Sequence, residues 1–289
     1  MKPPPFRYYD PQTLGEVVGL LGTLENAKLL AGGQSLMPML NMRFVLPDHV
    51  IDLNRIDGLS YIRESGGALE IGAMTRQRDL EFSDLVARSC PLMHEAIRQV
   101  GHRQTRNRGT LGGSLCHLDP SAELVSVAAA LDASVTVTGP AGERRIEFAE
   151  FPRGYMTPAV EPDEVLTGAR FPLWPKGHGW AFVEFARRHG DFAIVSAAVL
   201  IDEDQNGKIR RASLTLGGLG PAPVRVREVE QALIGQTAAA ELFRAVCEAC
   251  RKVEAMADVH APASYRQHLA AVLSRRALDA AHARAQERG

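Results

Sequence analysis

Two short glycine-rich segments hold the residues whose type and spacing are best suited to chemistry. One reads AGGQS at residues 31–35, and the other reads TLGGS at residues 110–114. Paired glycines let the backbone approach a ligand closely, so that its N–H groups form an anion-binding concavity. Each pair alone is more typical of a tight turn. The two loops together, each with its hydroxyl residues, predict a chain that grips a pyrophosphate from two sides without a lysine.

Several common nucleotide-binding and catalytic motifs are missing from the sequence. It has no G-x-x-x-x-G-K-[ST], no G-x-S-x-G and no H-E-x-x-H. It also lacks the G-x-G-x-x-G fingerprint of dinucleotide-binding Rossmann domains. A standard Rossmann nucleotide site is therefore not predicted.

The segment after the second loop supplies an acidic residue. Asp119 followed by Pro120 predicts the N-cap and first position of a helix over 121–131, which places Glu123 one turn inside. Glu123 could accept hydrogen bonds from sugar hydroxyls. His117 and Asp119 are only two potential metal ligands, so we predict no metal site there.

Basic residues and cysteines offer further candidates with two readings each. His102, Arg103, Arg106 and Arg108 precede the second loop, where they either face phosphates or a docking subunit, or form a solvated loop. The cysteines are Cys90, Cys116, Cys247 and Cys250. Cys247 and Cys250 form a C-x-x-C on one face of an expected helix, and we favour packing over a redox or metal pair.

The elements that must position these loops alternate between strands and helices. A capping box from Thr13 to Glu16 predicts a helix start, and the apolar run that follows it predicts a strand ending at the first loop. Further strands are expected at 49–53, 68–74, 133–139 and 144–151, and a helix at 92–100. After the prolines at 172 and 175, three strand patterns precede two long alanine-rich helices, and the glycines at 217–220 read as a strand-ending turn. This order predicts an α+β fold in both halves.

Composition narrows the function classes. Lys plus Arg number 33 and Asp plus Glu 34, so a large nucleic-acid-binding surface is not expected. No apolar run is long enough for a membrane span, and the start lacks the apolar core of a secretory signal. We therefore expect a cytoplasmic protein.

Four stretches carry a resemblance to a known family. They are KLLAGGQSLMPMLNMR (28–43), VGHRQTRNRGTLGGSLCHLDPSAEL (100–124), FARRHGDFAIVSAAV (185–199) and LTLGGLGPAPVRVREVEQAL (214–233). With them the chain resembles the FAD-binding, or medium, subunit of molybdenum hydroxylases, the carbon monoxide dehydrogenase and xanthine dehydrogenase family. The stretches span nearly the whole chain, and each half matches independently.

The resemblance implies a fold, a cofactor and a set of site residues. It implies a vanillyl-alcohol-oxidase-type FAD-binding domain over 1–175, with subdomains of roughly 1–55 and 56–175. A smaller α+β domain over 176–289, with a three-stranded antiparallel sheet and helices, would follow. The residues that match FAD-binding positions are Leu29, Leu30, Ala31, Gly32, Gly33, Gln34, Ser35, Leu36, Val100, Gly109, Thr110, Leu111, Gly112, Gly113, Ser114, Glu123 and Leu166, with Asp191 and Phe192 in a loop over the flavin ring. Val183 stands where some xanthine dehydrogenases have a flavin-side lysine, which argues against use of NAD.

The same resemblance implies an electron-transfer role within a complex. A large molybdopterin subunit would hydroxylate the substrate, and a small subunit with two [2Fe–2S] clusters would pass electrons to this chain. The FAD would then deliver them to an external acceptor, with no catalytic side chain required here. The expected assembly is a dimer of heterotrimers. Carbon monoxide, an N-heterocycle and a purine all stay open as substrates. The alternatives are a self-sufficient flavin oxidase of the same fold and a non-redox module that binds a nucleotide-like ligand.

Overall fold

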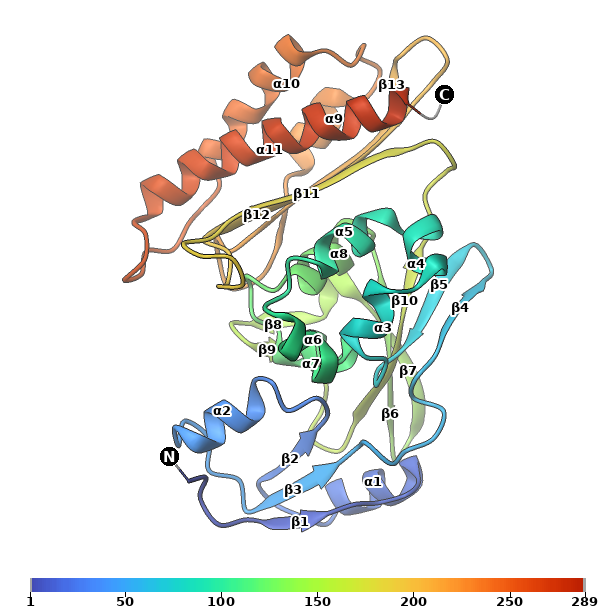
Figure 1. The fold of residues 1–289 in the computed structure, drawn as a ribbon, viewed down its shortest axis with the longest axis vertical. Coiled ribbons are helices and arrows are strands. Elements are labelled where there is room, and N and C mark those ends of the chain that lie inside the picture. The colour runs from blue at the N-terminus through green and yellow to red at the C-terminus, as the bar shows by residue number, and fades with distance from the viewer. Residues whose placement is uncertain (1, 288–289) are drawn as a thin grey trace.

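The computed structural model describes residues 2–287. It stacks three sheet-containing layers along the long axis of the molecule, in the order of the sequence (Figure 1). The N-terminal layer carries the first glycine loop, the middle layer carries the second, and the C-terminal layer covers the helices of the middle layer. The relative position of the two glycine loops therefore depends on how the layers pack against each other.

The N-terminal layer is a small parallel sheet in the order β1-β3-β2. Its strands are β1 (Arg7–Tyr9), β2 (Ala27–Leu30) and β3 (His49–Asp52), and its helices are α1 (Leu14–Leu21) and α2 (Leu36–Asn41). The predicted capping box is present, because Thr13 accepts from the Glu16 N–H at 3.2 Å and Glu16 accepts in return. The first glycine loop is the turn between β2 and α2.

The middle layer is an antiparallel sheet in the order β4-β5-β10-β6-β7, with helices on one face. Its strands are β4 (Ile62–Ser65), β5 (Ala68–Gly72), β6 (Ser134–Gly139), β7 (Gly142–Glu147) and β10 (Val165–Pro172). Its helices are α3 (Gln77–Glu81), α4 (Asp84–Ser89), α5 (Pro91–Ile97), α6 (Arg103–Arg108), α7 (Leu111–His117) and α8 (Glu123–Ala130). A 3-10 turn, η1 (Phe148–Glu150), precedes the short hairpin of β8 (Pro152–Gly154) and β9 (Thr157–Pro158).

The C-terminal layer is an antiparallel sheet covered on its outer face by a long helix. The sheet contains β11 (Gly179–Phe185), β12 (Val195–Glu203), β13 (Ile209–Gly217) and β14 (Val224–Arg225). The expected sheet of three strands is thus extended by a fourth strand of two residues. The helices are α9 (Arg227–Leu233), α10 (Ala240–Cys247), η2 (Glu248–Lys252) and α11 (Ala263–Gln286), and Figure 1 shows α11 lying across the sheet.

Two helix predictions differ from the structure. Asp119 is not the N-cap of α8; its carboxylate accepts from the N–H of Ser121 at 2.8 Å in a turn, and the helix begins only at Glu123. The first of the two expected long helices is short, because α10 gives way to a 3-10 turn at Glu248. Both Cys247 and Cys250 are nonetheless buried against α11, as packing cysteines would be.

The middle and C-terminal layers share one apolar core. Phe182 and Leu200 of the C-terminal sheet belong to the same buried cluster as α5 and α8. The opposite face of that sheet forms a second cluster with α11. The two domains therefore form a continuous packed unit where they meet. Within residues 2–287, no helix is long and apolar enough to cross a membrane.

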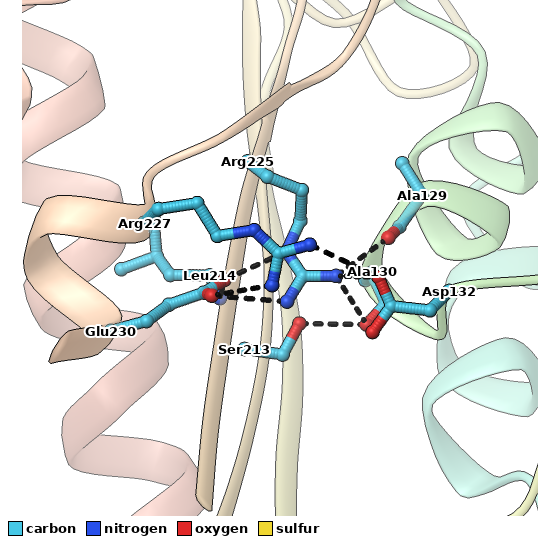
Figure 2. A network of polar contacts seen from close by, with 8 residues as sticks. All are labelled: Ala129, Ala130, Asp132, Ser213, Leu214, Arg225, Arg227 and Glu230. Carbon is cyan, nitrogen blue, oxygen red and sulfur yellow. Dashed lines mark hydrogen bonds and ion pairs between the residues drawn. The ribbon is translucent and has the colours of Figure 1, made fainter. Parts of the chain in front are cut away.

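An arginine network closes one end of the seam (Figure 2). Arg225 donates to the carbonyl oxygens of Ala129 and Ala130 at the end of α8, and pairs with Asp132 at 2.7 Å. Its Nε also pairs with the buried Glu230 at 2.7 Å. Because cations stabilise helix C-termini, this guanidinium both satisfies the last carbonyls of α8 and fixes the C-terminal layer against it.

Candidate functional site

The two glycine loops, residues 31–35 and 110–114, are far apart in the sequence but lie against each other in the structure. A Cβ on Gly32 would overlap the carbonyl of Arg108 and approach the Cα of Gly109 to 2.8 Å. A Cβ on Gly113 would lie 3.7 Å from the Cβ of Ala31. The first loop is therefore packed directly on the residues that lead into the second, and Gly32 is required for that packing.

The first loop has the donors that an anion site needs. The backbone N–H groups from Gly32 to Leu36 donate to no other atom within residues 2–287. Gly33 has a φ of +73°, a left-handed conformation that turns the chain between β2 and α2. The side chain of Ser35 likewise makes no hydrogen bond in the described chain. Consecutive free N–H groups in such a turn form a concavity for an anion, in line with the sequence prediction.

The second loop differs from the prediction, because its backbone donors are already engaged. The N–H groups of Leu111 and Gly112 donate to the carbonyls of Thr75 and Ala73, at 3.0 and 2.8 Å. Those of Gly113 and Ser114 donate to the side chain and carbonyl of Thr110. These bonds fasten α7 to the end of β5. The second loop can thus offer the Ser114 hydroxyl and a close backbone approach, whereas free N–H groups come from the first loop.

Two residues that the sequence did not single out brace the loops. Asn54 donates from Nδ2 to the Ala31 carbonyl at 3.0 Å, and Arg76 donates to the Arg108 carbonyl at 2.6 Å. Arg76 also donates to Oδ1 of Asn54 at 2.5 Å. Both side chains lie in connections after strands, and only the fold brings them together. No motif in the sequence marks them.

Glu123 is buried at the first residue of α8, with 4% of its surface exposed. Burial, and to a lesser extent the nearby carboxyl of Glu184, raises the pKa of this carboxyl to about 8. Glu123 is therefore largely protonated at neutral pH. A protonated carboxyl can donate as well as accept a hydrogen bond, which the sequence-based reading of a simple acceptor did not anticipate.

A cleft of about 830 Å³ opens between the middle and C-terminal layers. Its walls come from the turn before α8, from the β11–β12 loop that holds Asp191 and Phe192, and from the segment before α11. Phe192 is 58% exposed, so it is not a core residue. Asp119 on the cleft wall lies two residues after the end of α7, and a helix of seven residues is about 10 Å long. The cleft and the second glycine loop thus lie at opposite ends of one short helix.

The remaining predicted site residues line the surrounding core. Val100 is half-buried and Leu166 fully buried in the core of the middle layer, and they supply apolar surface only. Val183 points away from that layer and packs against the α11 side of its sheet. Its neighbour Glu184 occupies the opposite face. The side chain at position 183 therefore does not reach the middle layer in this chain.

The basic cluster divides into one structural and several exposed residues. Arg106 pairs with Glu81 at 2.8 Å and donates to the Val100 carbonyl, so it holds α6 in place. His102 is exposed and lies against Gly190 of the β11–β12 loop, where a Cβ would overlap the imidazole. No group of three or more His, Cys, Asp or Glu residues suited to a metal occurs within residues 2–287.

Comparison with known proteins identifies the chain. Residues 4–174 match the family model of the FAD binding domain in molybdopterin dehydrogenase, and residues 180–281 match that of the CO dehydrogenase flavoprotein C-terminal domain. The chain belongs to this family of flavoprotein subunits. The predicted resemblance and fold are thereby confirmed, and the chain is an oxidoreductase subunit with an FAD-binding domain.

Relatives of the flavoprotein subunit align with it over almost their full length. It is 39% identical to the 6-hydroxypseudooxynicotine dehydrogenase complex subunit alpha of Paenarthrobacter nicotinovorans, covering 96% of this chain and 95% of the relative. It is 37% identical to the carbon monoxide dehydrogenase medium chain of Hydrogenophaga pseudoflava, covering 98% and 99%. A solved structure of carbon monoxide dehydrogenase from that organism, which lacks the Mo-pyranopterin moiety, matches with a TM-score of 0.95 and 38% identity, covering 98% and 99%.

The geometry of this chain fits FAD. The free N–H groups of the first loop suit a pyrophosphate, and the cleft beyond α7 has room for a ring system. The buried, protonated Glu123 suits a neutral heterocycle better than a charged group. The residues present therefore agree with the cofactor that the family binds.

Proposed function

We propose that this flavoprotein subunit passes electrons from [2Fe–2S] clusters of a partner subunit, through its FAD, to an external acceptor. The observation that carries the proposal is the position of the two glycine loops and the cleft at opposite ends of α7. This arrangement supports a cofactor whose phosphates are held between the N-terminal and middle layers and whose ring is reachable from the cleft between the middle and C-terminal layers. When bound, FAD supplies the redox chemistry, and the protein supplies its position and electrostatic surroundings.

Each part of the site has a separate task in this proposal. The N–H groups of Gly32 to Leu36 and the hydroxyls of Ser35 and Ser114 hold the pyrophosphate. Asn54 and Arg76 keep the two loops in register. Glu123 donates or accepts a hydrogen bond at the ring end, Val100 and Leu166 provide apolar walls, and the loop with Asp191 and Phe192 covers the ring and limits access to it.

The partners follow from the class of complex to which the relatives belong. A large molybdopterin subunit would oxidise the substrate and a small subunit with two [2Fe–2S] clusters would deliver the electrons, in a dimer of heterotrimers in the cytoplasm. The relatives are named for carbon monoxide and for 6-hydroxypseudooxynicotine, so one flavoprotein architecture serves different substrates. Substrate choice therefore belongs to the large subunit. A self-sufficient oxidase is not favoured, since these relatives are subunits of complexes.

Anaerobic titration of the purified chain with FAD tests the proposal at its first step. We expect one FAD per chain and a flavin spectrum, with no oxidation of N-heterocycles, purines or carbon monoxide by the chain alone. Oxidation of any of these by the isolated chain would contradict the relay and favour the oxidase. Failure to bind FAD would contradict the site.

A further inference from the structure

Buried polar atoms without partners gather in one seam of the molecule, where α8 packs on the inner face of the C-terminal sheet. Within residues 2–287 most of the buried side-chain oxygen atoms that lack a hydrogen-bond partner lie here, namely those of Ser126, Glu184, Ser196 and Thr215. A buried polar atom without a partner is unfavourable, and such atoms in a folded protein point to ordered water, an ion or a functional role. Four of them, one on α8 and three on the sheet that faces it, require an explanation.

The absence of a side chain at Gly217 brings two of the hydroxyls together. The position that a Cβ of Gly217 would take is 2.5 Å from Oγ of Ser126 and 2.5 Å from Oγ of Ser196. The two oxygens are therefore no farther apart than twice that distance. A single water, with hydrogen bonds of about 2.8 Å, spans such a gap. The separation between these hydroxyls of α8 and β12 therefore suits one bridging water.

Each hydroxyl lies near a carboxyl, that of the buried Glu123 or that of the half-buried Glu184. Ser126 follows Glu123 by three residues on α8, which places both on the same face of the helix. Ser196 is the cross-strand register partner of Glu184, whose Oε2 is buried without a partner. Glu123 and Glu184 therefore lie at the two ends of the path through Ser126 and Ser196.

This path adjoins the cleft. The carbonyl of Pro120 lies 3.3 Å from the Cβ position of Gly217 and accepts from the N–H of Gly218 at 2.8 Å. Pro120 and Gly218 both line the cleft between the domains. The seam therefore opens at the place where the proposed function puts the flavin ring.

The electrostatics of the seam favour a proton on the carboxyls. Burial raises the pKa of Glu184 to about 7, and burial together with the nearby charge of Glu184 raises that of Glu123 to about 8. Asp119, in the turn before α8, acts in the same direction, while Arg106 on α6 acts against it. Strands β12 and β13 present uncharged Ser196, Thr215 and Gly217. The charged groups on the other neighbouring elements are engaged elsewhere. Arg225 on β14 lies at the other end of α8, and Glu95 on α5 pairs with Arg284. Burial lowers the pKa of His117 on α7, which favours its neutral form.

We propose that Glu123 and Glu184 share a proton beside the flavin ring, connected through Ser126, Ser196 and ordered water. The inference rests on the proposed function, because it takes the cleft to hold the ring of FAD. In this arrangement Glu184 is a positioning residue, because it affects the ring only through Glu123. Burial is the main reason that Glu123 is protonated, and the negative charge of Glu184 adds to it, so that Glu123 presents a hydrogen-bond donor to the ring at neutral pH. Without the charge of Glu184, Glu123 would lose its proton, and with it the hydrogen-bond donor, at a lower pH.

The test compares FAD binding across pH for the wild-type chain and matched variants. We expect the dissociation constant of FAD in the wild type to rise as pH increases through about 8, up to about tenfold per pH unit once the last shared proton is lost. Glu184→Gln should move this transition to lower pH by about one unit, because a like charge near Glu123 is removed. Glu123→Gln should make binding independent of pH, and the exposed Glu241→Gln should behave as wild type.

Infrared spectroscopy of the FAD-bound chain gives a readout that does not depend on affinity. At neutral pH the wild type should show the C=O stretch of a protonated carboxylic acid, and Glu123→Gln should weaken it, because only Glu184 can then carry the proton. If Glu184→Gln does not fold, Ser196→Ala should still shift the pH of the binding transition. A wild type that binds FAD equally from pH 6 to 9 and shows no such band would overturn the shared proton while leaving FAD binding intact. A chain that binds FAD at no pH would overturn the proposed function itself.

Discussion

The guanidinium of Arg76 donates a hydrogen bond to Oδ1 of Asn54 at 2.5 Å, and this contact connects the groups that hold the two glycine loops. Asn54 holds the carbonyl of Ala31 in the first loop, and Arg76 holds the carbonyl of Arg108 before the second. Neither side chain lies on a glycine loop. Both nevertheless determine how the loops face each other.

Arg76→Lys tests this brace. Lysine keeps the charge but cannot donate to both carbonyl and amide oxygens in the planar geometry of a guanidinium. We expect FAD to bind about tenfold more weakly, which corresponds to about 1.4 kcal/mol. Fluorescence titration with FAD measures the change. The control is Arg78→Lys, since Arg78 makes a 3.4 Å contact to Asn107 and lies over the ring of Phe82, and within residues 2–287 it donates to neither glycine loop. Equal weakening in both variants would show that the brace has no specific role.

Gly33→Ala tests the first loop. Gly33 has a φ of +73°, so an added side chain strains the turn that presents the free N–H groups, by about 1–2 kcal/mol. We expect strong loss of bound flavin with the circular dichroism unchanged. Gly58→Ala is the matched control, because Gly58 has a φ of +81° and no atom within 4 Å of its Cβ position. If Gly33→Ala retains as much flavin as Gly58→Ala, the loop is only a turn.

Much of this site was predictable from the sequence because it depends on local signals. Paired glycines mark both loops, and Thr13 and Glu16 mark the start of α1. Glu123 is marked by its place after Asp119 and Pro120, and by the resemblance. The engagement of the N–H groups of Leu111 and Gly112 by Thr75 and Ala73 was not predictable, because those partners lie on a distant strand end. For the same reason Arg76 and Glu184 were missed: each becomes significant only through neighbours that the fold supplies.

Phe192→Ala tests the loop over the cleft. Because the side chain is 58% exposed, its removal should leave the melting temperature nearly unchanged. We expect several-fold faster reoxidation of the reduced flavin by dioxygen, about 1 kcal/mol in barrier, since the loop limits access to the ring. Stopped-flow absorbance gives the rate. Phe82→Ala, with a side chain 62% exposed elsewhere in the molecule, is the control, and an unchanged rate for Phe192→Ala would show that the loop does not cover the ring.

Arg225→Met tests the network at the other end of the seam (Figure 2). The change leaves Glu230, which is 4% exposed, with a poorly compensated buried charge. It also removes one donor from each of the carbonyls of Ala129 and Ala130, which keep the N–H of Asp132 and the hydroxyl of Ser213. Removing one member of a buried pair destabilises strongly, and we expect a loss of about 3 kcal/mol in urea unfolding. Arg227→Met should cost less than about 1 kcal/mol, because Arg227 is exposed and its pairs are correspondingly weak. Equal losses would contradict a specific role for Arg225.

The central claim is that electrons enter this chain from an iron–sulfur partner. Its most direct test is to mix, without oxygen, the FAD-loaded chain with the chemically reduced [2Fe–2S] subunit of its own complex and to follow the flavin absorbance by stopped flow. We predict loss of the oxidised flavin band together with reoxidation of the clusters, and no such change with the substrate of the complex alone. If the flavin stays oxidised beside the reduced clusters, or is reduced by substrate without any partner, the account is contradicted.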